Sequence, residues 1–239
     1  MHKFANPARF NRLADQILPW SLGVMILAFG YGLYLTFFAS PEDYQQGQTV
    51  RIMYIHVPSA MMSMGAYVMI AVTSFIGLVW RHPLAAISGK ACAPIGAGFT
   101  ALALLTGMAW GQPMWGTFWI WDARLTSVLV LFFLYLGYMA IWQAMEDHEK
   151  ASKAAAILAL VGAINIPIIK FSVNWWNTLH QPASSMFSKN PDIPASMQAP
   201  LFAMIIAFSA YFTTVLLWRM KLEVDRRKIA AMRTARMTQ

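Results

Sequence analysis

Cysteine and charge are both scarce in this chain of 239 residues. The single cysteine, Cys92, excludes an intramolecular disulfide, a CxxC redox pair and a CxxCH motif. The sequence also contains no internal repeat, no glycine-rich phosphate loop and no G-x-S-x-G elbow, so neither ATP binding nor serine hydrolysis has support in it. Any ATP-driven step would therefore need a partner.

Hydrophobic residues make up 58% of the chain and charged residues only 12%. Charge is missing from six runs, each near the ~20 residues that a membrane-spanning helix needs. The predicted spans are 20–39, 58–80, 92–111, 125–145, 154–169 and 199–218. The composition therefore predicts an all-α polytopic membrane protein, with one six-helix transmembrane domain over residues 1–218 and a basic tail over 219–239.

Two features modify this outline. The fifth span is short and contains Asn165 and Pro167, which predicts a helix that is kinked or packed inside the bundle, where freed backbone groups find partners. The first span follows basic residues as a signal peptide does, but it is longer than a usual signal-peptide core and lacks a small-x-small cleavage site. We expect it to remain as the first helix.

Lysine and arginine are distributed unevenly among the predicted loops. Residues 1–19, 81–91, 146–153 and 219–239 hold 14 of the 18. Because basic residues accumulate in cytoplasmic loops, this pattern predicts that both termini are cytoplasmic. The opposite, periplasmic side then carries the loops 40–57 and 170–198 and the segment 112–126. The basic tail is best explained by topology and attraction to anionic lipid, with partner docking as the alternative.

Tryptophan is concentrated in one segment, because residues 115–126 read Trp-Gly-Thr-Phe-Trp-Ile-Trp-Asp-Ala-Arg-Leu-Thr. Four other tryptophans fall singly at predicted cytoplasmic helix ends, as an aromatic belt predicts: Trp20, Trp80, Trp142 and Trp218. The remaining six gather at the opposite face in two regions: Trp110, Trp115, Trp119, Trp121, Trp175 and Trp176. This concentration favours a flat apolar surface for a large planar ligand, with an aromatic belt as the alternative.

The histidines divide in the same way. Three lie beside charged residues in predicted cytoplasmic segments, as solvated surface groups do: His2, His82 and His148. His56 directly precedes the second span, where Pro58 suits the first turn of a helix, and His180 lies in the outer loop before the last span. Two neutral imidazoles on the same face as the tryptophan-rich segment predict axial ligation of one iron from both sides of its plane.

Together these residues predict a heme site at the outer surface, since a porphyrin has broad apolar faces, an iron and anionic propionates. The candidate heme-contacting residues are His56, His180, Trp115, Trp119, Trp121, Asp122, Arg124, Trp175 and Trp176, and the two histidines are the candidate metal ligands. The available outer cations are Arg51, Arg124, Lys170 and Lys189, with ordinary loop charge as the alternative. For Asp122, capping of the fourth helix or pairing with Arg124 is favoured over direct heme contact.

The pattern Trp-Gly-x-x-Trp-x-Trp-Asp-x-Arg-Leu-Thr at 115–126 resembles the WWD signature of heme-handling proteins that serve cytochrome c maturation. The six predicted spans, the Tyr-Ile-His-Val-Pro run at 54–58 and the Trp-Trp-Asn-Thr-Leu-His-Gln run at 175–181 extend this resemblance over nearly the whole chain. Within the group, the chain is similar to the CcmC family of heme exporters. Larger relatives, the CcmF-type lyases and CcsA-type synthetases, have more spans and further histidines.

The resemblance implies a heme carrier and scaffold rather than an enzyme. In that family, non-covalent heme b is held at the periplasmic face of the bacterial inner membrane between two axial histidines and the WWD domain, and His56 and His180 match the axial positions. The heme is then presented to the chaperone CcmE. The ATP-binding cassette subunits CcmA and CcmB and the small membrane protein CcmD are further implied partners, and no nucleic acid is implied.

Two other functions stay open on the residues alone. A membrane electron-transfer cytochrome would need histidines inside spans on facing helices, whereas His56 and His180 are predicted at or beyond the outer helix ends. A ligand-free assembly scaffold would explain the helices and the basic tail. It would not explain why tryptophan and histidine cluster on one face.

Overall fold

The computed structural model describes residues 6–180 and 193–237, and these form a helical bundle without a β-strand. Its helices are α1 Pro7–Tyr34, α2 Met53–Trp80, α3 Pro83–Trp115, α4 Ala123–Ala144, α5 His148–Gly162, α6 Asn165–Trp175 and α7 Ala195–Met237. With α5 and α6 taken as one crossing, six segments are long and apolar enough to cross a membrane. The prediction of an all-α protein with six spans is confirmed.

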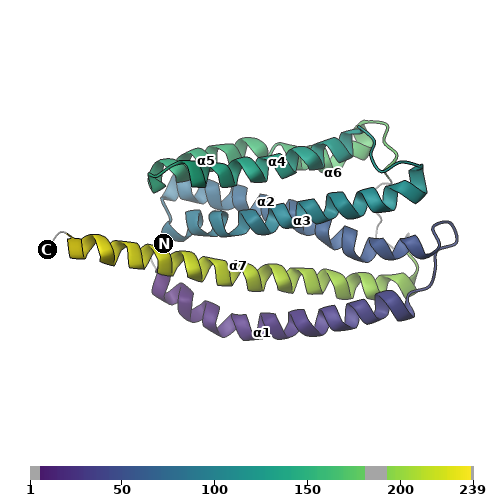
Figure 1. The fold of residues 1–239 in the computed structure, drawn as a ribbon, viewed down its shortest axis with the longest axis horizontal. Coiled ribbons are helices and arrows are strands. Elements are labelled where there is room, and N and C mark those ends of the chain that lie inside the picture. The colour runs from purple at the N-terminus through teal and green to yellow at the C-terminus, as the bar shows by residue number, and fades with distance from the viewer. Residues whose placement is uncertain (1–5, 181–192, 238–239) are drawn as a thin grey trace.

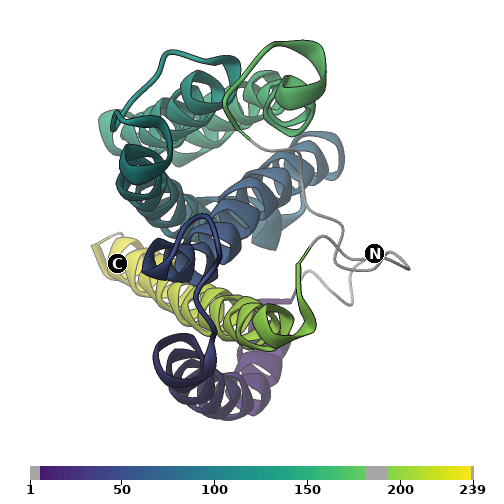
Figure 2. The same ribbon diagram turned by 90° about the vertical axis from the view of Figure 1, so that its right-hand side faces the viewer.

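The helices are arranged in three layers (Figures 1 and 2). The pair α1 and α7 packs on one side of α2 and α3, and α4, α5 and α6 pack on the other. Buried tyrosines join the layer of α2 and α3 to the layer of α4, α5 and α6. Tyr135 of α4 lies edge-on to Tyr67 of α2, with ring centroids 5.1 Å apart. The Tyr135 hydroxyl donates to the Ser63 carbonyl at 2.6 Å. The buried core draws most of its residues from α2, α3, α4 and α7.

The bundle has two ends that differ in content (Figure 1). Helix α1 begins and α7 ends at one end, which we call the termini end. The opposite end carries His56, the non-helical residues 116–122 and His180, and we call it the histidine end.

Several helices continue past the predicted apolar spans, because a helix outside the bilayer needs no apolar residues. Helix α1 begins at Pro7, where the Asn6 side chain accepts a hydrogen bond from the Ala8 amide at 2.9 Å. Helix α7 has 43 residues. At about 1.5 Å per residue this is about 65 Å, roughly twice the hydrocarbon thickness of a bilayer. The tail predicted over 219–239 is thus a straight extension of α7 as far as it is described.

Helix α3 begins at Pro83, nine residues before the predicted start, so Cys92 lies inside this helix and is fully buried rather than at its end. Trp142 also differs from the expected pattern, because it is buried at 9% exposure, whereas Trp20, Trp80 and Trp218 are exposed as belt residues are.

The fifth crossing is broken, as the sequence predicts. Helix α5 ends at Gly162 and α6 begins at Asn165. Pro167 has no N–H to donate to the Ala163 carbonyl, which interrupts the hydrogen-bond ladder at this point. The Asn165 side chain donates to the Ser127 carbonyl at 2.8 Å, so the break is packed against α4.

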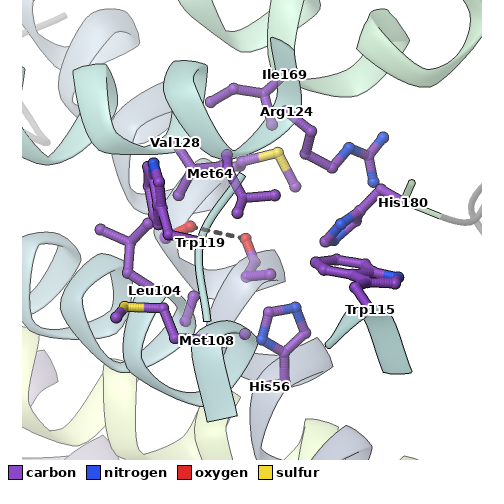
Figure 3. A pocket seen from close by; sticks show the side chains of 15 residues that line it. His56, Met64, Leu104, Met108, Trp115, Trp119, Arg124, Val128, Ile169 and His180 are labelled. Carbon is purple, nitrogen blue, oxygen red and sulfur yellow. Dashed lines mark hydrogen bonds between the residues drawn. The ribbon is translucent and has the colours of Figure 1, made fainter. Parts of the chain in front are cut away.

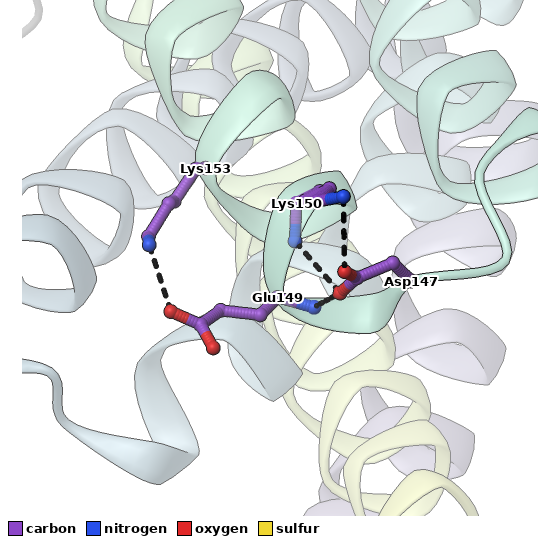
Figure 4. A network of polar contacts seen from close by, with 4 residues as sticks. All are labelled: Asp147, Glu149, Lys150 and Lys153. Carbon is purple, nitrogen blue, oxygen red and sulfur yellow. Dashed lines mark hydrogen bonds and ion pairs between the residues drawn. The ribbon is translucent and has the colours of Figure 1, made fainter.

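Exposed charges define the start of α5 at the termini end (Figure 4). The Asp147 carboxylate accepts hydrogen bonds from the amides of Lys150 at 3.1 Å and Glu149 at 2.9 Å, and these bonds lower the pKa of Asp147. Lys153 pairs with Glu149 one turn away at 2.7 Å. Asp147 therefore caps α5.

Candidate functional site

The first histidine is part of a helix. Residues Gln48–Ile52 form a 3₁₀ turn that leads into α2 at Met53, so His56 is the fourth residue of α2. The sequence predicts His56 directly before the second apolar span, at or beyond the helix end, with Pro58 in the first turn of that helix; the helix instead begins at Met53, so His56 lies in its first turn and Pro58 follows that turn. Pro58 is tolerated one turn later, because the only bond it removes is the one to the Tyr54 carbonyl.

A cavity with about 620 Å³ of empty space, part of it open to solvent, lies at the histidine end (Figure 3). Five candidate residues line it: His56 from α2, Trp115 from the end of α3, Trp119, Arg124 from α4, and His180. The rest of the lining is mostly apolar and comes from Ala60, Ser63, Met64, Ala103, Leu104, Gly107, Met108, Leu125, Val128 and Ile169. Mostly apolar walls with a few convergent polar groups are typical of sites for small organic ligands.

The two imidazoles face the same space. Their ring centroids are 6.5 Å apart and the ring planes are inclined by 55°. Two imidazoles on opposite sides of one metal, with metal–nitrogen bonds of about 2 Å, have centroids about 6 Å apart. The observed spacing therefore fits a metal held between His56 and His180.

Thr106 favours one tautomer of His56. The Thr106 hydroxyl donates to the Leu102 carbonyl at 2.6 Å. The same oxygen lies 3.1 Å from Nδ1 of His56, so it accepts a hydrogen bond from an Nδ1–H group. Nε2 then carries the lone pair, as a metal-binding histidine with a fixed tautomer requires.

The environment of His180 differs from that of His56. Burial, followed by the nearby positive charge of Arg124 and by His56, lowers the pKa of His180 to about 4. The ring is therefore neutral at pH 7. Its Nδ1 atom is buried and has no hydrogen-bond partner among the described residues. The Trp115 ring lies beside it at a centroid distance of 5.3 Å.

Two glycines of α3 make room for these rings. A Cβ atom at Gly107 would lie 3.0 Å from Cε1 of His56, and one at Gly111 would lie 2.8 Å from Cε3 of Trp115. Gly116, with φ of 75°, ends α3 immediately after Trp115. Neither Gly107 nor Gly111 was predicted as a site residue. They lie eight and four residues before Trp115, a spacing that places all three residues on one face of the helix.

The tryptophans of the candidate set do not all reach the cavity. Trp115 and Trp119 line it, and the indole nitrogen of Trp119 is buried without a hydrogen-bond partner among the described residues. Trp121 lies edge-on to Trp119, does not line the cavity and is 75% exposed. Trp175 and Trp176 are also exposed and do not line the cavity. Trp175 stacks on Phe171 of the same helix.

Asp122 and Arg124 have separate roles at the start of α4. The Asp122 carboxylate accepts a hydrogen bond from the Leu125 amide at 2.7 Å, which confirms the prediction that it caps this helix. The Arg124 guanidinium lines the cavity and donates to the Ser172 hydroxyl at 3.3 Å and to the Lys170 carbonyl at 3.5 Å. These bonds tie α4 to α6.

Only one of the four outer cations borders the cavity in the described structure. Arg51 donates to the Ser40 carbonyl at 3.4 Å instead, and Lys170 does not line the cavity. Lys189 lies outside the described residues. Arg124 is therefore the cation best placed to meet an anionic group of a ligand held between the histidines.

Comparison with known proteins identifies the family of the chain. The profile of the family described as CcmC, heme exporter protein C, matches residues 1–235. Heme exporter protein C of Bradyrhizobium diazoefficiens is 54% identical over 228 residues, which are 95% of this chain and 86% of that protein. Heme exporter protein C of Escherichia coli K12 is 47% identical, covering 92% and 89% of the two chains.

A third relative extends the similarity to nearly the full length of both proteins. Heme exporter protein C of Paracoccus denitrificans is 43% identical over 231 residues, which are 96% of this chain and 95% of that one. The helices, the paired histidines and the tryptophan-rich segment thus occur in a chain that is similar to these exporters from end to end. The chain belongs to the CcmC family of heme exporter proteins.

Proposed function

We propose that this protein holds heme between His56 and His180 at the histidine end and passes it to a periplasmic heme chaperone, CcmE, for cytochrome c maturation. The observation that carries the proposal is the pair of imidazoles, 6.5 Å apart across a largely apolar cavity. Relatives at 43–54% identity are named heme exporter protein C, which makes heme the ligand to test.

The cavity residues fit a porphyrin. His56 and His180 supply axial ligands, and Trp115 and Trp119 offer aromatic contact to the macrocycle. The Arg124 guanidinium and the unpartnered indole N–H of Trp119 are donors for a propionate. Bound non-covalently, as heme b, the cofactor would bring its own equatorial ligands. The porphyrin would have to supply these ligands, because no group of three or more metal-binding side chains gathers anywhere in the described chain.

The exposed tryptophans suit the transfer step. Trp121, Trp175 and Trp176 lie outside the cavity and leave large apolar surfaces uncovered. Exposed aromatic surface is typical of protein interfaces. We assign them to contact with the chaperone, which must approach the cavity to receive heme, and not to heme itself.

The membrane setting follows from charge. From the uneven distribution of lysine and arginine we infer that both termini are cytoplasmic and that the histidine end faces the periplasmic side of the bacterial inner membrane. The chain has no phosphate-binding loop. We therefore assign ATP hydrolysis to the partner subunits CcmA and CcmB, with CcmD as the small membrane component of the same complex.

Optical spectroscopy of the purified full-length protein with added heme tests the ligation. We expect a six-coordinate, low-spin spectrum that is lost in His56→Ala and in His180→Ala and regained when free imidazole is added. His82→Ala, at the termini end, is the matched control and should leave the spectrum unchanged. Unchanged spectra in both cavity variants would remove the axial assignment.

A second experiment separates binding from transfer. Trp119→Ala removes a cavity wall and should weaken heme retention, whereas Trp121→Ala removes exposed surface and should slow transfer to the chaperone while retention stays normal. Heme loss to a scavenging apoprotein measures the first effect, and covalent loading of the chaperone measures the second. Equal retention defects in both variants would contradict the division of roles.

A further inference from the structure

A second cavity lies at the termini end, between α3 and α7. It has about 450 Å³ of empty space and is lined by Lys90 and Ala91 of α3 and by Arg219, Leu222, Glu223 and Arg226 of α7. In contrast to the heme cavity, its lining contains three cations and one carboxylate. The function proposed above makes no use of it.

The carboxylate in this lining is already neutralised. The Glu223 side chain, which is only 10% exposed, accepts hydrogen bonds from Lys90 Nζ at 2.9 Å and from Arg227 Nε at 3.1 Å. Arg219 uses its Nε to bind the Ala91 carbonyl at 3.0 Å. Within the described residues no carboxylate forms an ion pair with Arg219 or Arg226, so the cavity keeps a positive charge excess.

The position of the cavity along α3 matches the depth expected for a lipid headgroup. Along α3, Lys90 is 17 residues before Gly107, which contacts His56. This separation is about 25 Å of helix, close to the ~30 Å thickness of the hydrocarbon core. Exposed Trp218 directly precedes Arg219, and Trp142 lies 5.1 Å beneath the Lys90 ammonium, so indoles mark the interface at this level.

We propose that the α3–α7 cavity binds the phosphate of an anionic phospholipid headgroup from the leaflet at the termini end. Arg219 and Arg226 present guanidinium forks that match phosphate oxygens, and Lys90, which also pairs with Glu223, lies in the same lining. Leu222, also in the lining, is 48% exposed and gives the glycerol and upper acyl chains an apolar contact. Basic cavities between membrane helices are typical sites for such headgroups.

The test uses the full-length protein in a nonionic detergent. Dioctanoyl phosphatidylglycerol, dioctanoyl phosphatidylcholine and inorganic phosphate are titrated separately, and bound ligand is followed by native mass spectrometry and by the shift in thermal unfolding. We expect phosphatidylglycerol to bind and stabilise the protein, phosphatidylcholine to bind more weakly, and inorganic phosphate to have no effect at the same concentration.

Arg226→Gln locates the site, and Arg233→Gln is its matched control, because Arg233 lies two turns further along α7 and does not line the cavity. Arg226→Gln should weaken phosphatidylglycerol binding about fivefold, since one basic group near a membrane surface contributes about 1 kcal/mol. Equal effects of the two variants would overturn the assignment to this cavity. Equal binding of phosphate and phosphatidylglycerol would make it a site for free anions and overturn the lipid assignment.

Discussion

The two ends of the bundle hold cavities of opposite character. The cavity at the histidine end is lined by aromatic and aliphatic side chains, two imidazoles and one arginine, whereas the cavity at the termini end is lined mainly by charged groups. Burial lowers the pKa of the His180 imidazole, so this ring is neutral at pH 7, whereas the lining at the termini end presents two exposed guanidinium groups, those of Arg219 and Arg226. The fold thus separates the proposed heme site from the proposed lipid site.

Acid should abolish the first site and spare the second. Because the pKa of His180 is lowered to about 4, this imidazole stays neutral as the pH falls from 7 to 5, and it takes up a proton only near pH 4. We expect the low-spin heme spectrum to persist at pH 5 and to disappear with a midpoint at or below about 4. Phosphatidylglycerol binding, measured on the same samples, should survive because arginine stays protonated. Loss of the heme spectrum near pH 6.5 would contradict the burial of His180.

Thr106→Val removes the oxygen that accepts a hydrogen bond from Nδ1 of His56 while it preserves side-chain shape. Loss of such a partner typically weakens metal binding by about 10- to 100-fold, and we expect heme affinity to fall within that range. The heme reduction potential should shift as well, because the hydrogen bond tunes the donor strength of the imidazole. Thr106→Ser keeps the hydroxyl and should restore both properties. An unchanged heme reduction potential in Thr106→Val would show that Thr106 acts only through packing.

Arg124→Gln should weaken heme retention by at least about tenfold, since a hydrogen bond to a charged group contributes at least about 1.5 kcal/mol. Lys170→Gln is the control at the same end, because Lys170 does not line the cavity. Neither variant should alter phosphatidylglycerol binding at the termini end, just as Arg226→Gln should not alter heme retention. Cross-effects between the ends, measured by heme dissociation and by native mass spectrometry, would show that the two cavities are coupled.

The helix caps should give the smallest effects. Asp122→Ala removes the acceptor of the Leu125 amide, which costs about 1 kcal/mol, and it should lower heme affinity a few-fold through the start of α4 and Arg124. Asp147→Ala removes the exposed cap of α5 at the other end and should leave heme affinity unchanged. Heme titration of both variants checks the difference. Equal heme affinities in the two variants would show that the cap of α4 does not affect the heme site.

The fold was largely predictable because a helix that crosses a bilayer must be long and apolar, and such runs are visible in sequence. The ends of the helices were harder to predict from the sequence. Helix α1 starts at Pro7 and α7 runs to Met237, well beyond the apolar runs, because charged residues outside the bilayer continue a helix without penalty. The break before Asn165 was predictable from Pro167, whose missing N–H acts locally.

The candidate site was predictable in part. His56, His180, Trp115, Trp119 and Arg124 were identified from residue type and predicted face, and the structure brings all five to one cavity. Trp121, Trp175 and Trp176 were predicted together with them but lie outside the cavity. Residues on the same face of the membrane can point in different directions, and the sequence does not show which. Gly107, Gly111 and Thr106 were missed, since their roles depend on close approach between helices.

The class of the protein, the number of crossings, the cap at Asp122 and the unequal charge of the two sides could all be predicted from the amino-acid sequence. These properties depend on hydropathy, local hydrogen bonding and net charge, each of which acts within a short stretch of chain. The 6.5 Å spacing of the His56 and His180 ring centroids, the contact of His56 with Thr106, the lowered pKa of His180 and the second cavity could be seen only in the folded bundle. Each of these arises where residues far apart in the chain meet and exclude water, so it depends on packing between helices rather than on any one segment.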